Sequence, residues 1–410
     1  MIDIKYLLLG LVLAASFGCS KNSSGGIDSG TTDTDTDTDV DTDTDTDSDS
    51  DTDPTSGPNM CPGEVQSFIW IANTTESTLS KVCTINAQEV ARYRTCPTSP
   101  CDPSRTSVNL HGDMVVSNRY PTTGPSSVTK FIANYWECTM DWNGNGQIDT
   151  STGPTEVLPW GEDDCMAWNT ELSLSGMAVG VRATAWDGEE DPETGLGGSV
   201  WIGATYNKTI YKLNGETGLV EGGMVTALAH YGGVMDGLGN FWTVRMNCTA
   251  STCDVERINM TTLETQVFPV HCGYGITADA QGRIWTSGSD CVNRLDPASG
   301  INDWLQVDGS NRGIAVDGEG SVWSANTAGD LVRVSEADVT LIDRFPVGGS
   351  NMIGVAIDYE GYVWTVSEDI SSAHKIDPVD YTITDVPIGL GPYTYSDMTG
   401  MQLLNVTPIE

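Results

Sequence analysis

One short segment carries oxygen side chains at a spacing that could hold a metal ion. In Asp141-Trp-Asn-Gly-Asn-Gly-Gln-Ile-Asp149 these side chains occupy alternate positions, and a glycine stands where such a loop turns sharply. Alternating short oxygen ligands let one loop wrap a hard cation, so we expect structural Ca²⁺ here. The alternative is a set of Asn-Gly turns without an ion. The expected ligands are Asp141, Asn143, Asn145, Gln147 and Asp149.

The calcium pattern departs from its usual form at the twelfth position, where Thr152 replaces a bidentate glutamate. No helical pattern flanks the loop. Cys138 and Cys165 bracket it, and a disulfide between them would hold an insertion of about 138–165 in place. The carboxylates farther along that could replace the missing ligand are Glu156, Asp163 and Asp164.

The cysteines indicate an oxidising compartment. There are eleven, and setting aside Cys19, treated below, leaves an even ten. None has the Cys-x-x-Cys spacing of zinc or redox sites, so we expect disulfides between cysteines that are neighbours in sequence, although spacing alone leaves the connectivity open. The expected pairs are Cys61 with Cys83, Cys96 with Cys101, Cys138 with Cys165, Cys248 with Cys253 and Cys272 with Cys291.

Other constellations that perform chemistry are missing from the sequence. It contains no Gly-x-Ser-x-Gly elbow, which would position a nucleophilic serine, and no Cys-x-x-Cys-His motif, which would attach a haem. The cysteines are assigned to disulfides. Serine or cysteine nucleophiles and haem-based electron transfer are therefore disfavoured.

A repeated sequence pattern predicts the secondary-structure elements that would position these residues. The pattern Gly-hydrophobic-x-hydrophobic-Asp-x-x-Gly-x-hydrophobic-Trp recurs about every forty residues, a period typical of propellers, solenoids and arrays. In each copy the aspartate and glycine lie between two short apolar runs, as in a hairpin turn, because both tolerate positive φ. Complete copies span 232–242, 275–285, 313–323 and 354–364.

A further strand follows each tryptophan and carries one basic residue among alternating apolar ones. Earlier copies of this strand bring the count to seven units. Seven such units predict an all-β fold, a seven-bladed β-propeller of four-stranded antiparallel blades over residues 61–410. We expect the tryptophans between blades, and the basic residues on solvated strands or, if they point inward, along the channel. The basic residues are Lys81, Lys130, Lys212, Arg257, Arg294, Arg333 and Lys375.

The N-terminus predicts where the propeller works. Lys5 precedes an apolar run that ends at Ala15, and Ser16-Phe-Gly-Cys19 follows, the pattern of a bacterial lipoprotein signal at 1–18 with Cys19 as the lipidated residue. The apolar run is too short for a permanent membrane helix. Because Ser20 replaces the aspartate that retains lipoproteins on the inner membrane, we expect an outer-membrane lipoprotein facing the periplasm or cell surface. An ordinary cleaved secretory signal is the alternative.

The segment from Asp33 to Asp53 alternates aspartate with threonine or serine. Aspartates on alternate residues repel one another, and no apolar surface offsets the chain entropy, so we expect 19–60 to be a disordered linker that holds the propeller off the membrane. The formal net charge is −38. This charge argues against nucleic acid as a partner, because phosphate binding needs a basic surface. We expect a monomer that contacts the membrane only through its lipid.

The repeat, together with openings such as Phe68-Ile-Trp-Ile-Ala-Asn73, resembles the streptogramin lyase (virginiamycin B lyase) type of propeller and related NHL-like repeats over about 62–406. The resemblance implies the fold more strongly than the activity. Members with lyase activity open a cyclic depsipeptide antibiotic by elimination. They use magnesium, a histidine just ahead of a Gly-hydrophobic segment and a glutamate just after that blade's tryptophan, because a base must remove the proton beside the ester.

His230 stands just ahead of Gly232, where the resemblance would place the histidine. The matching glutamate is missing, because Thr243, Val244 and Arg245 follow Trp242, and an arginine there disfavours magnesium. We therefore expect structural roles for the histidines, with His230 as the one catalytic candidate. The remaining histidines, His111, His271 and His374, lack the required neighbours.

Two functional classes follow from these observations. The leading hypothesis is a displayed, non-enzymatic binding propeller whose channel mouth holds a peptide, glycan or partner protein. The alternative is a streptogramin-lyase-like C–O lyase or hydrolase with an atypical site, in which His230 is the base and Mg²⁺ is required. We also expect the ring to close through a partial first unit near Val65 and a trailing strand over 401–406.

Overall fold

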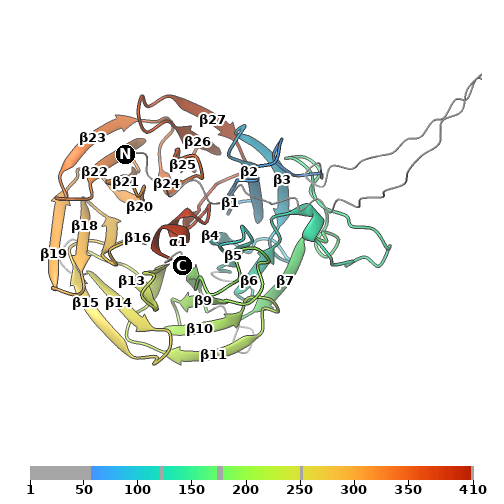
Figure 1. The fold of residues 1–410 in the computed structure, drawn as a ribbon, viewed down its shortest axis with the longest axis horizontal. Coiled ribbons are helices and arrows are strands. Elements are labelled where there is room, and N and C mark those ends of the chain that lie inside the picture. Colours follow the sequence, from blue (N-terminus) through green and yellow to red (C-terminus); the bar gives the residue numbers. More distant parts are fainter. Residues whose placement is uncertain (1–56, 121–123, 173–178, 250–252, 408–410) are drawn as a thin grey trace, which may run out of the picture. The chain divides into compact units, whose positions relative to one another are not determined.

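The computed structural model describes residues 57–120, 124–172, 179–249 and 253–407. Its regular structure is almost entirely antiparallel β-sheet, arranged as seven blades around a central channel (Figure 1). The predicted seven-bladed β-propeller with four-stranded blades is confirmed. Residues 1–56, which include the expected signal peptide, Cys19 and most of the expected linker, lie outside the described residues.

Six blades consist of four consecutive strands that run from the channel outward. Inner strands such as β12 are buried along their whole length, whereas outer strands such as β11 are largely exposed. The second blade contains β4 (Pro103–Val108), β5 (Met114–Asn118), β6 (Ser127–Phe131) and β7 (Met166–Glu171). The third contains β8 (Val181–Trp186), β9 (Ser199–Ala204), β10 (Thr209–Asn214) and β11 (Val220–Val225). The fourth contains β12 (His230–Met235), β13 (Asn240–Arg245), β14 (Cys253–Asn259) and β15 (Thr265–Val270).

The fifth, sixth and seventh blades each contain one complete copy of the repeat. The fifth blade contains β16 (Gly275–Ala278), β17 (Ile284–Gly288), β18 (Cys291–Asp296) and β19 (Ile301–Gln306). The sixth contains β20 (Asn311–Val316), β21 (Ser321–Asn326), β22 (Asp330–Ser335) and β23 (Leu341–Pro346). The seventh contains β24 (Met352–Ile357), β25 (Val363–Ser367), β26 (Ser372–Ile376) and β27 (Ile383–Pro387).

The first blade joins the two ends of the propeller. Its own strands are β1 (Phe68–Asn73), β2 (Thr78–Cys83) and β3 (Gln88–Arg94). The C-terminal segment runs along β1, where the Trp70 amide donates to the Met398 carbonyl at 2.9 Å and the Tyr393 amide to the Ala72 carbonyl at 3.0 Å. Within that segment, β28 (Tyr395–Ser396) pairs with β4 in parallel. The C-terminal residues therefore complete the first blade and close the ring.

The expected trailing strand over 401–406 is wrong, because these residues form the helix α1 (Met401–Val406). Leu403 and Val406 are both buried, and their separation of three residues suits one face of a helix. The buried Asp397 carboxylate accepts hydrogen bonds from the amides of Thr399, Gly400 and Leu403, which holds the start of the helix. Val65, where the N-terminal closing strand was expected, lies outside any strand.

The repeated aspartate acts through hydrogen bonds rather than through positive φ. In the fourth blade, Asp236 Oδ1 accepts from the amides of Leu238 and Asn240, and Oδ2 accepts from the Trp242 indole at 2.8 Å. Gly239 supplies the positive φ of the turn, at 80°. The tryptophans of the repeat are fully buried, as expected. The same aspartate–indole bond recurs in Asp279–Trp285, Asp317–Trp323 and Asp358–Trp364.

The repeated basic residues are neither free in solvent nor in the channel. Except for Lys130, which lies opposite Val115, each is paired with the tryptophan of the preceding strand, as Arg333 is at 4.7 Å from the Trp323 ring. Lys81 is fully buried, and its Nζ donates to Asn59 Oδ1 at 3.1 Å and to the Ala133 carbonyl at 2.6 Å. These cations therefore stabilise the blades.

The insertion lies between β6 and β7 and contains a single short 3₁₀ helix, η2 (Tyr135–Glu137). A disulfide between Cys138 and Cys165 closes it at its base. The five disulfides join cysteines that are neighbours in sequence, which confirms the expected pairing. The remaining four are Cys61–Cys83, Cys96–Cys101, Cys248–Cys253 and Cys272–Cys291.

Candidate ligand site at the channel

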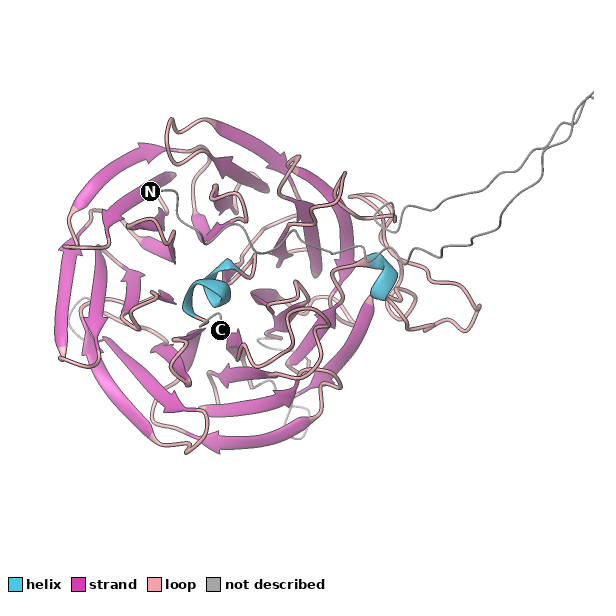
Figure 2. Ribbon diagram, in the orientation of Figure 1, coloured by secondary structure: helices cyan, strands magenta, loops and turns pink. Residues whose placement is uncertain are grey.

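The helix α1 closes one end of the channel. It lies at the centre of the ring (Figures 1 and 2), where the inner strands end. Gln402 Nε2 donates to the carbonyl of Met235, the last residue of β12, at 3.3 Å. Gly237, in the turn after β12, is in direct contact with the Val406 backbone. A ligand therefore cannot enter from this end.

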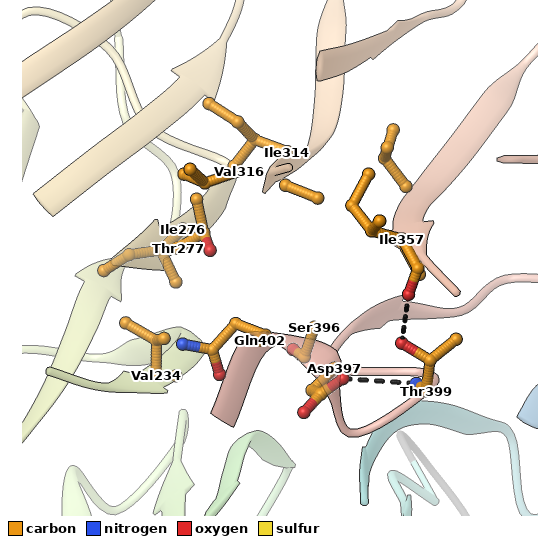
Figure 3. Close-up of a pocket in the computed structure, with 14 residues that line it drawn as sticks. Val234, Ile276, Thr277, Ile314, Val316, Ile357, Ser396, Asp397, Thr399 and Gln402 are labelled. Atoms are coloured by element: carbon orange, nitrogen blue, oxygen red, sulfur yellow. Dashed lines mark hydrogen bonds between the residues drawn. The ribbon is translucent and has the colours of Figure 1, made fainter. Parts of the chain in front are cut away.

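The middle of the channel is apolar and small. Its lining comes from β12, β16, β20 and β24, with Gln402 and Asp397 at the helix side (Figure 3). The cavity there has a volume of about 20 Å³, which is room for roughly one water molecule. An organic ligand does not fit inside. The apolar lining includes Val234, Ile276, Ile314, Val316 and Ile357.

Arginine and tyrosine side chains gather at the other end, where the inner strands begin. Arg182, Tyr231 and Arg312 are each the second residue of an inner strand, in β8, β12 and β20. Tyr274 immediately precedes β16, and Arg105 lies early in β4. We call the whole group the arginine–tyrosine cluster: Arg105, Arg119, Arg182, Arg312, Tyr231, Tyr274, Tyr393 and Tyr395.

The tyrosines form the centre of the arginine–tyrosine cluster. Tyr231 and Tyr393 share a hydrogen bond of 2.9 Å between their hydroxyls, and the Tyr274 hydroxyl also bonds to that of Tyr393. The Tyr231 and Tyr274 rings meet edge to face with centroids 5.0 Å apart, and Tyr395 stacks on Tyr274 at 5.0 Å. Two blades and the C-terminal segment are thereby held in one aromatic contact.

The guanidinium groups pack on these rings. Arg182 Cζ lies 4.6 Å from the Tyr231 ring centroid, Arg119 Cζ 4.9 Å from that of Tyr393, and Arg312 Cζ 4.3 Å from that of Tyr274. Arg105 is fully buried, lies over the Tyr395 ring, and donates through Nε and Nη2 to the Tyr231 carbonyl at 3.2 and 3.0 Å. Cation–π contacts hold the arginines in place but leave most of their charge uncompensated.

Within the described residues, none of the four cluster arginines forms an ion pair. Arginines elsewhere do so, as in Arg245–Asp254 and Arg344–Asp330, with N–O distances of 2.6 and 2.7 Å. In the cluster, Arg105 Nη1, Arg182 Nη1 and Arg312 Nε are buried and have no hydrogen-bond acceptor in the described residues. The chain has nineteen lysines and arginines, so about a fifth of its positive charge converges on one place without a carboxylate partner.

The electrostatics of the cluster follow from this crowding. Burial, reinforced by the charge of Arg182, lowers the pKa of Arg105 to about 9, and burial also lowers the pKa of Arg119. For Tyr231, burial raises the pKa, but the neighbouring Arg105 and Arg182 charges outweigh it, and the pKa is lowered. The lowered pKa of Tyr231 therefore reflects the two guanidinium charges, whereas burial is the main cause for the arginines and raises the pKa of both Tyr274 and Tyr393.

Asp102 acts on Arg119 through its charge, and a second carboxylate in this field is Glu368, beyond the end of β25. Burial raises its pKa, while the charges of Arg119 and Arg312 act in the opposite direction. Its Oε2 accepts a hydrogen bond from Asn351 Nδ2. These two carboxylates do not balance four guanidiniums, so the cluster keeps a net positive charge in a strongly acidic protein.

His230 lies next to Tyr231 in sequence but packs against Gly203 of the neighbouring blade rather than in the cluster, at a point where the pairing of β12 is irregular. It is fully buried, and its Nε2 forms a hydrogen bond of 2.8 Å with Thr226 Oγ1. Burial lowers its pKa to about 4. Within the described residues, no carboxylate forms an ion pair with it, and Arg245 pairs with Asp254 instead.

The other three histidines also lie outside the cluster. His111 Nε2 lies 2.9 Å from Glu137 Oε2, which ties the insertion to the second blade. His374 Nδ1 lies 2.7 Å from Asp385 Oδ1, and the His271 ring stacks on Trp304 with centroids 4.5 Å apart. Each of these three histidines therefore has a structural contact of its own.

The expected calcium loop is compact and exposed. Asp141 accepts hydrogen bonds from the amides of Asn145 and Gly146, each at 3.0 Å. Asp149 Oδ2 accepts from the side-chain amides of Asn143 and Asn145 at 2.9 and 2.6 Å. Hydrogen bonds therefore join four of the five expected ligands, but Asn143 and Asn145 turn Nδ2 towards Asp149, and their Oδ1 atoms accept from the amides of Asn145 and Gln147. Gln147 joins this network through its backbone amide.

The carboxylates considered as replacement ligands have other partners. Asp164 is buried and accepts from the amides of Trp142 and Asp149 at 2.8 and 2.7 Å. Asp163 accepts from the Ser151 hydroxyl and amide, and Glu156 accepts from the Thr152 hydroxyl. No group of three or more His, Cys, Asp or Glu side chains suited to a metal occurs in the described part of the chain.

The sequence reasoning did not identify the arginine–tyrosine cluster. A signal was nevertheless present, because the cluster uses the position just before the first glycine in three of the four complete copies of the repeat. That position holds Tyr231 before Gly232, Tyr274 before Gly275 and Arg312 before Gly313. In β8, β12 and β20 the pairing shifts register at this position, so the residue there is an extra one beside the regular ladder.

Comparison with known proteins supports the propeller fold but gives no information about the chemistry of the site. No protein-family model and no curated protein matches the sequence. Among solved structures, a catalytically inactive virginiamycin B lyase from Staphylococcus aureus with quinupristin aligns with a TM-score of 0.52 and 13% identity, over 72% of this chain and 88% of that one. Hydrazine synthase from Kuenenia stuttgartiensis aligns with a TM-score of 0.51 and 14% identity, over 73% and 90%. At such identities the likeness shows the fold alone. In the described ranges, no helix is long and apolar enough to cross a membrane.

Proposed function

We propose that this protein is a non-enzymatic binding propeller that holds its ligand at the arginine–tyrosine end of the channel. The observation that carries the proposal is the convergence of four arginines, none with a carboxylate partner among the described residues, at the one channel end that α1 does not close. Rigid elements position all of them, which suits a preformed binding site. A peptide, a glycan or a partner protein could present the group that enters the cluster.

The geometry of His230 supports binding over catalysis. A general base must reach the proton that it removes, whereas the His230 ring is buried between blades, and Thr226 occupies its Nε2. A lyase reaction of the streptogramin type would also need a carboxylate and Mg²⁺ beside that histidine. The residues that follow Trp242 offer Arg245, which pairs with Asp254.

The N-terminal sequence supports display of this propeller at the cell envelope. We propose lipidation at Cys19, an acidic linker and an outer-membrane lipoprotein that is monomeric and contacts the membrane through its lipid only. The disulfides suit such a location, because they persist in oxidising compartments. We also propose that the loop from Asp141 to Asp149 binds Ca²⁺ in a structural role, supported by the spacing of its Asp and Asn side chains and by the compact fold of the loop.

The proposed function is tested by separating ring opening from ligand retention. Incubation of the full chain with streptogramin B and Mg²⁺ should leave the depsipeptide intact. A small-molecule and peptide extract of the bacterial envelope, passed over immobilised protein, should leave a compound on the wild type that Arg182→Gln loses. Arg94→Gln is the matched control, because Arg94 is exposed at the end of β3. Ring opening that disappears in His230→Ala, or retention that is equal in all variants, would overturn the proposal.

A further inference from the structure

We propose that the group bound at the arginine–tyrosine cluster is a carboxylate, held by the free N–H groups of Arg105, Arg182 and Arg312. This inference rests on the proposed binding function and specifies the chemistry of the ligand. It would make the protein a receptor for small acids or for larger molecules that present a single carboxylate at the channel.

The free donors point to an oxyanion. Arg105 is completely buried, and two of its nitrogens bind the Tyr231 carbonyl while Nη1 has no acceptor among the described residues. Arg182 Nη1 and Arg312 Nε, from two other blades, are buried and unpaired in the same way. Buried charged donors without acceptors are costly, and an oxyanion satisfies several of them at once.

The tyrosines favour the same kind of ligand. Their hydroxyls form a connected group at the centre of the cluster, and the buried Tyr395 hydroxyl has no partner among the described residues. A hydroxyl can donate to an oxyanion, so the group adds neutral donors to the charged ones. The Tyr231 ring centroid lies 4.6 Å from Arg182 Cζ and 4.8 Å from Arg105 Cζ. An anion bound to these two guanidinium groups would therefore lie close to Tyr231.

The charge balance favours a carboxylate over phosphate or a polyanion. Glu368 already lies within the field of Arg119 and Arg312, so a dianionic group would meet a neighbouring negative charge. The whole chain carries a formal charge of −38, which repels extended polyanions beyond the reach of the cluster. A single planar carboxylate matches the two parallel N–H groups that a guanidinium presents.

The experiment measures the affinity of the full chain for small probes by isothermal titration at constant ionic strength. The probes are acetate, D-galacturonate, D-galactose and inorganic phosphate, where galactose matches galacturonate without its carboxylate. We expect saturable binding of the carboxylates and none of galactose. Arg182→Gln and Arg312→Gln should each weaken carboxylate binding by about tenfold or more, the loss typical of a charged hydrogen bond. Arg94→Gln should bind as the wild type does.

A second readout separates direct binding from a general effect on folding. An anion in the cluster offsets the positive charges of Arg105 and Arg182, so saturating galacturonate should raise the pKa of Tyr231, seen in the tyrosine absorbance titration as a component absent from Tyr231→Phe. An unchanged titration in the presence of bound galacturonate would place that ligand elsewhere and overturn the inference.

The remaining outcomes also decide the question. Galacturonate binding without acetate binding still supports a carboxylate, within a larger ligand. Phosphate binding that is tighter than carboxylate binding, equal binding of galactose, or no binding of any probe overturns the carboxylate assignment. In each of those cases, retention of an envelope compound by the wild type but not by Arg182→Gln would still support the proposed binding function. Failure of the carboxylate assignment and failure of the binding function are therefore distinguishable.

Discussion

Two neighbouring residues of β12 illustrate how the propeller separates structural from functional chemistry. Tyr231 faces the channel and contacts the charges of Arg105 and Arg182, whereas His230 faces the space between blades and bonds to Thr226. The pairing of β12 is irregular between His230 and Gly232, and Tyr231 is the extra residue there. The histidine that the lyase resemblance singles out is therefore a buried neutral group, and the residue beside it belongs to the candidate ligand site.

The buried His230 should make stability depend on pH. Its pKa falls from 6.5 to about 4 on folding, so the folded state binds fewer protons in between, and the free energy of unfolding decreases as pH falls from about 6.5 to about 4. The full effect is on the order of 3 kcal/mol. Urea unfolding at pH 7 and pH 4.5 should show a smaller loss in His230→Gln, which keeps a partner for Thr226, than in the wild type.

A control for this prediction is needed because Asp397 titrates in the opposite sense. Burial raises its pKa to about 6, so its contribution to stability is lost as pH rises through the window from about 4 to 6. Comparing His230→Gln with the wild type at each pH cancels this term. Equal pH dependence in both proteins would show that His230 is not buried in its neutral form.

At the scale of elements, the hairpin turn between the first and second strands is the unit that builds a blade. Its aspartate bonds to two turn amides and to the indole of the second strand, and its glycine adopts positive φ, as Gly239 and Gly361 do at 80° and 88°. One short segment thus fixes the turn and the packing between blades together. This local completeness explains why four copies could be recognised from the sequence.

The insertion between β6 and β7 is the element for which we predict metal binding. Isothermal titration of the full chain with Ca²⁺ should show one site with a Kd of roughly 0.1–1 mM, the weak range of extracellular modules, because Thr152 replaces the bidentate glutamate. Asp149→Ala should abolish it. Glu193→Gln, in another exposed loop, is the matched control and should leave it unchanged. If the wild type showed no heat of binding, the calcium proposal would be wrong.

At the scale of the whole propeller, the C-terminal segment joins the two ends of the ring and then closes the channel. Residues 391–398 run along β1, and α1 follows at the centre of the ring. The same segment supplies Tyr393 and Tyr395 to the arginine–tyrosine cluster. Ring closure and the candidate ligand site therefore depend on one stretch of chain.

Truncation should separate these roles. Ending the chain after Gly400 removes α1 and the burial of Leu403 and Val406, which should lower stability by roughly 3–5 kcal/mol. Ending it after Leu390 also removes the inner strand of the first blade and should prevent folding. Ending it after Thr407 keeps α1 and serves as the control. Thermal unfolding checks all three, and equal stability after the Gly400 and Thr407 truncations would refute a stabilising role for α1.

Local patterns explain which parts of the structure could be predicted. The disulfides could be paired because cysteines close in sequence lie on adjacent strands or at the base of one loop, as Cys138 and Cys165 do. The segment 401–406 could not be assigned, because six residues with apolar side chains at several spacings suit either a strand or a helix. Only the channel decides between them, since it has space for a helix and leaves no sheet edge there for a strand.

The sequence by itself determined the repeat, its hairpins and tryptophans, and hence the seven-bladed propeller, because each of these depends on residues within one blade. Only the tertiary structure decided where the chemistry lies. Arg105, Arg182 and Arg312 belong to three blades, and the tyrosines among them come from two more and from the C-terminal segment. The repeat marks the positions of Tyr231, Tyr274 and Arg312, but only closure of the ring brings the beginnings of the inner strands together.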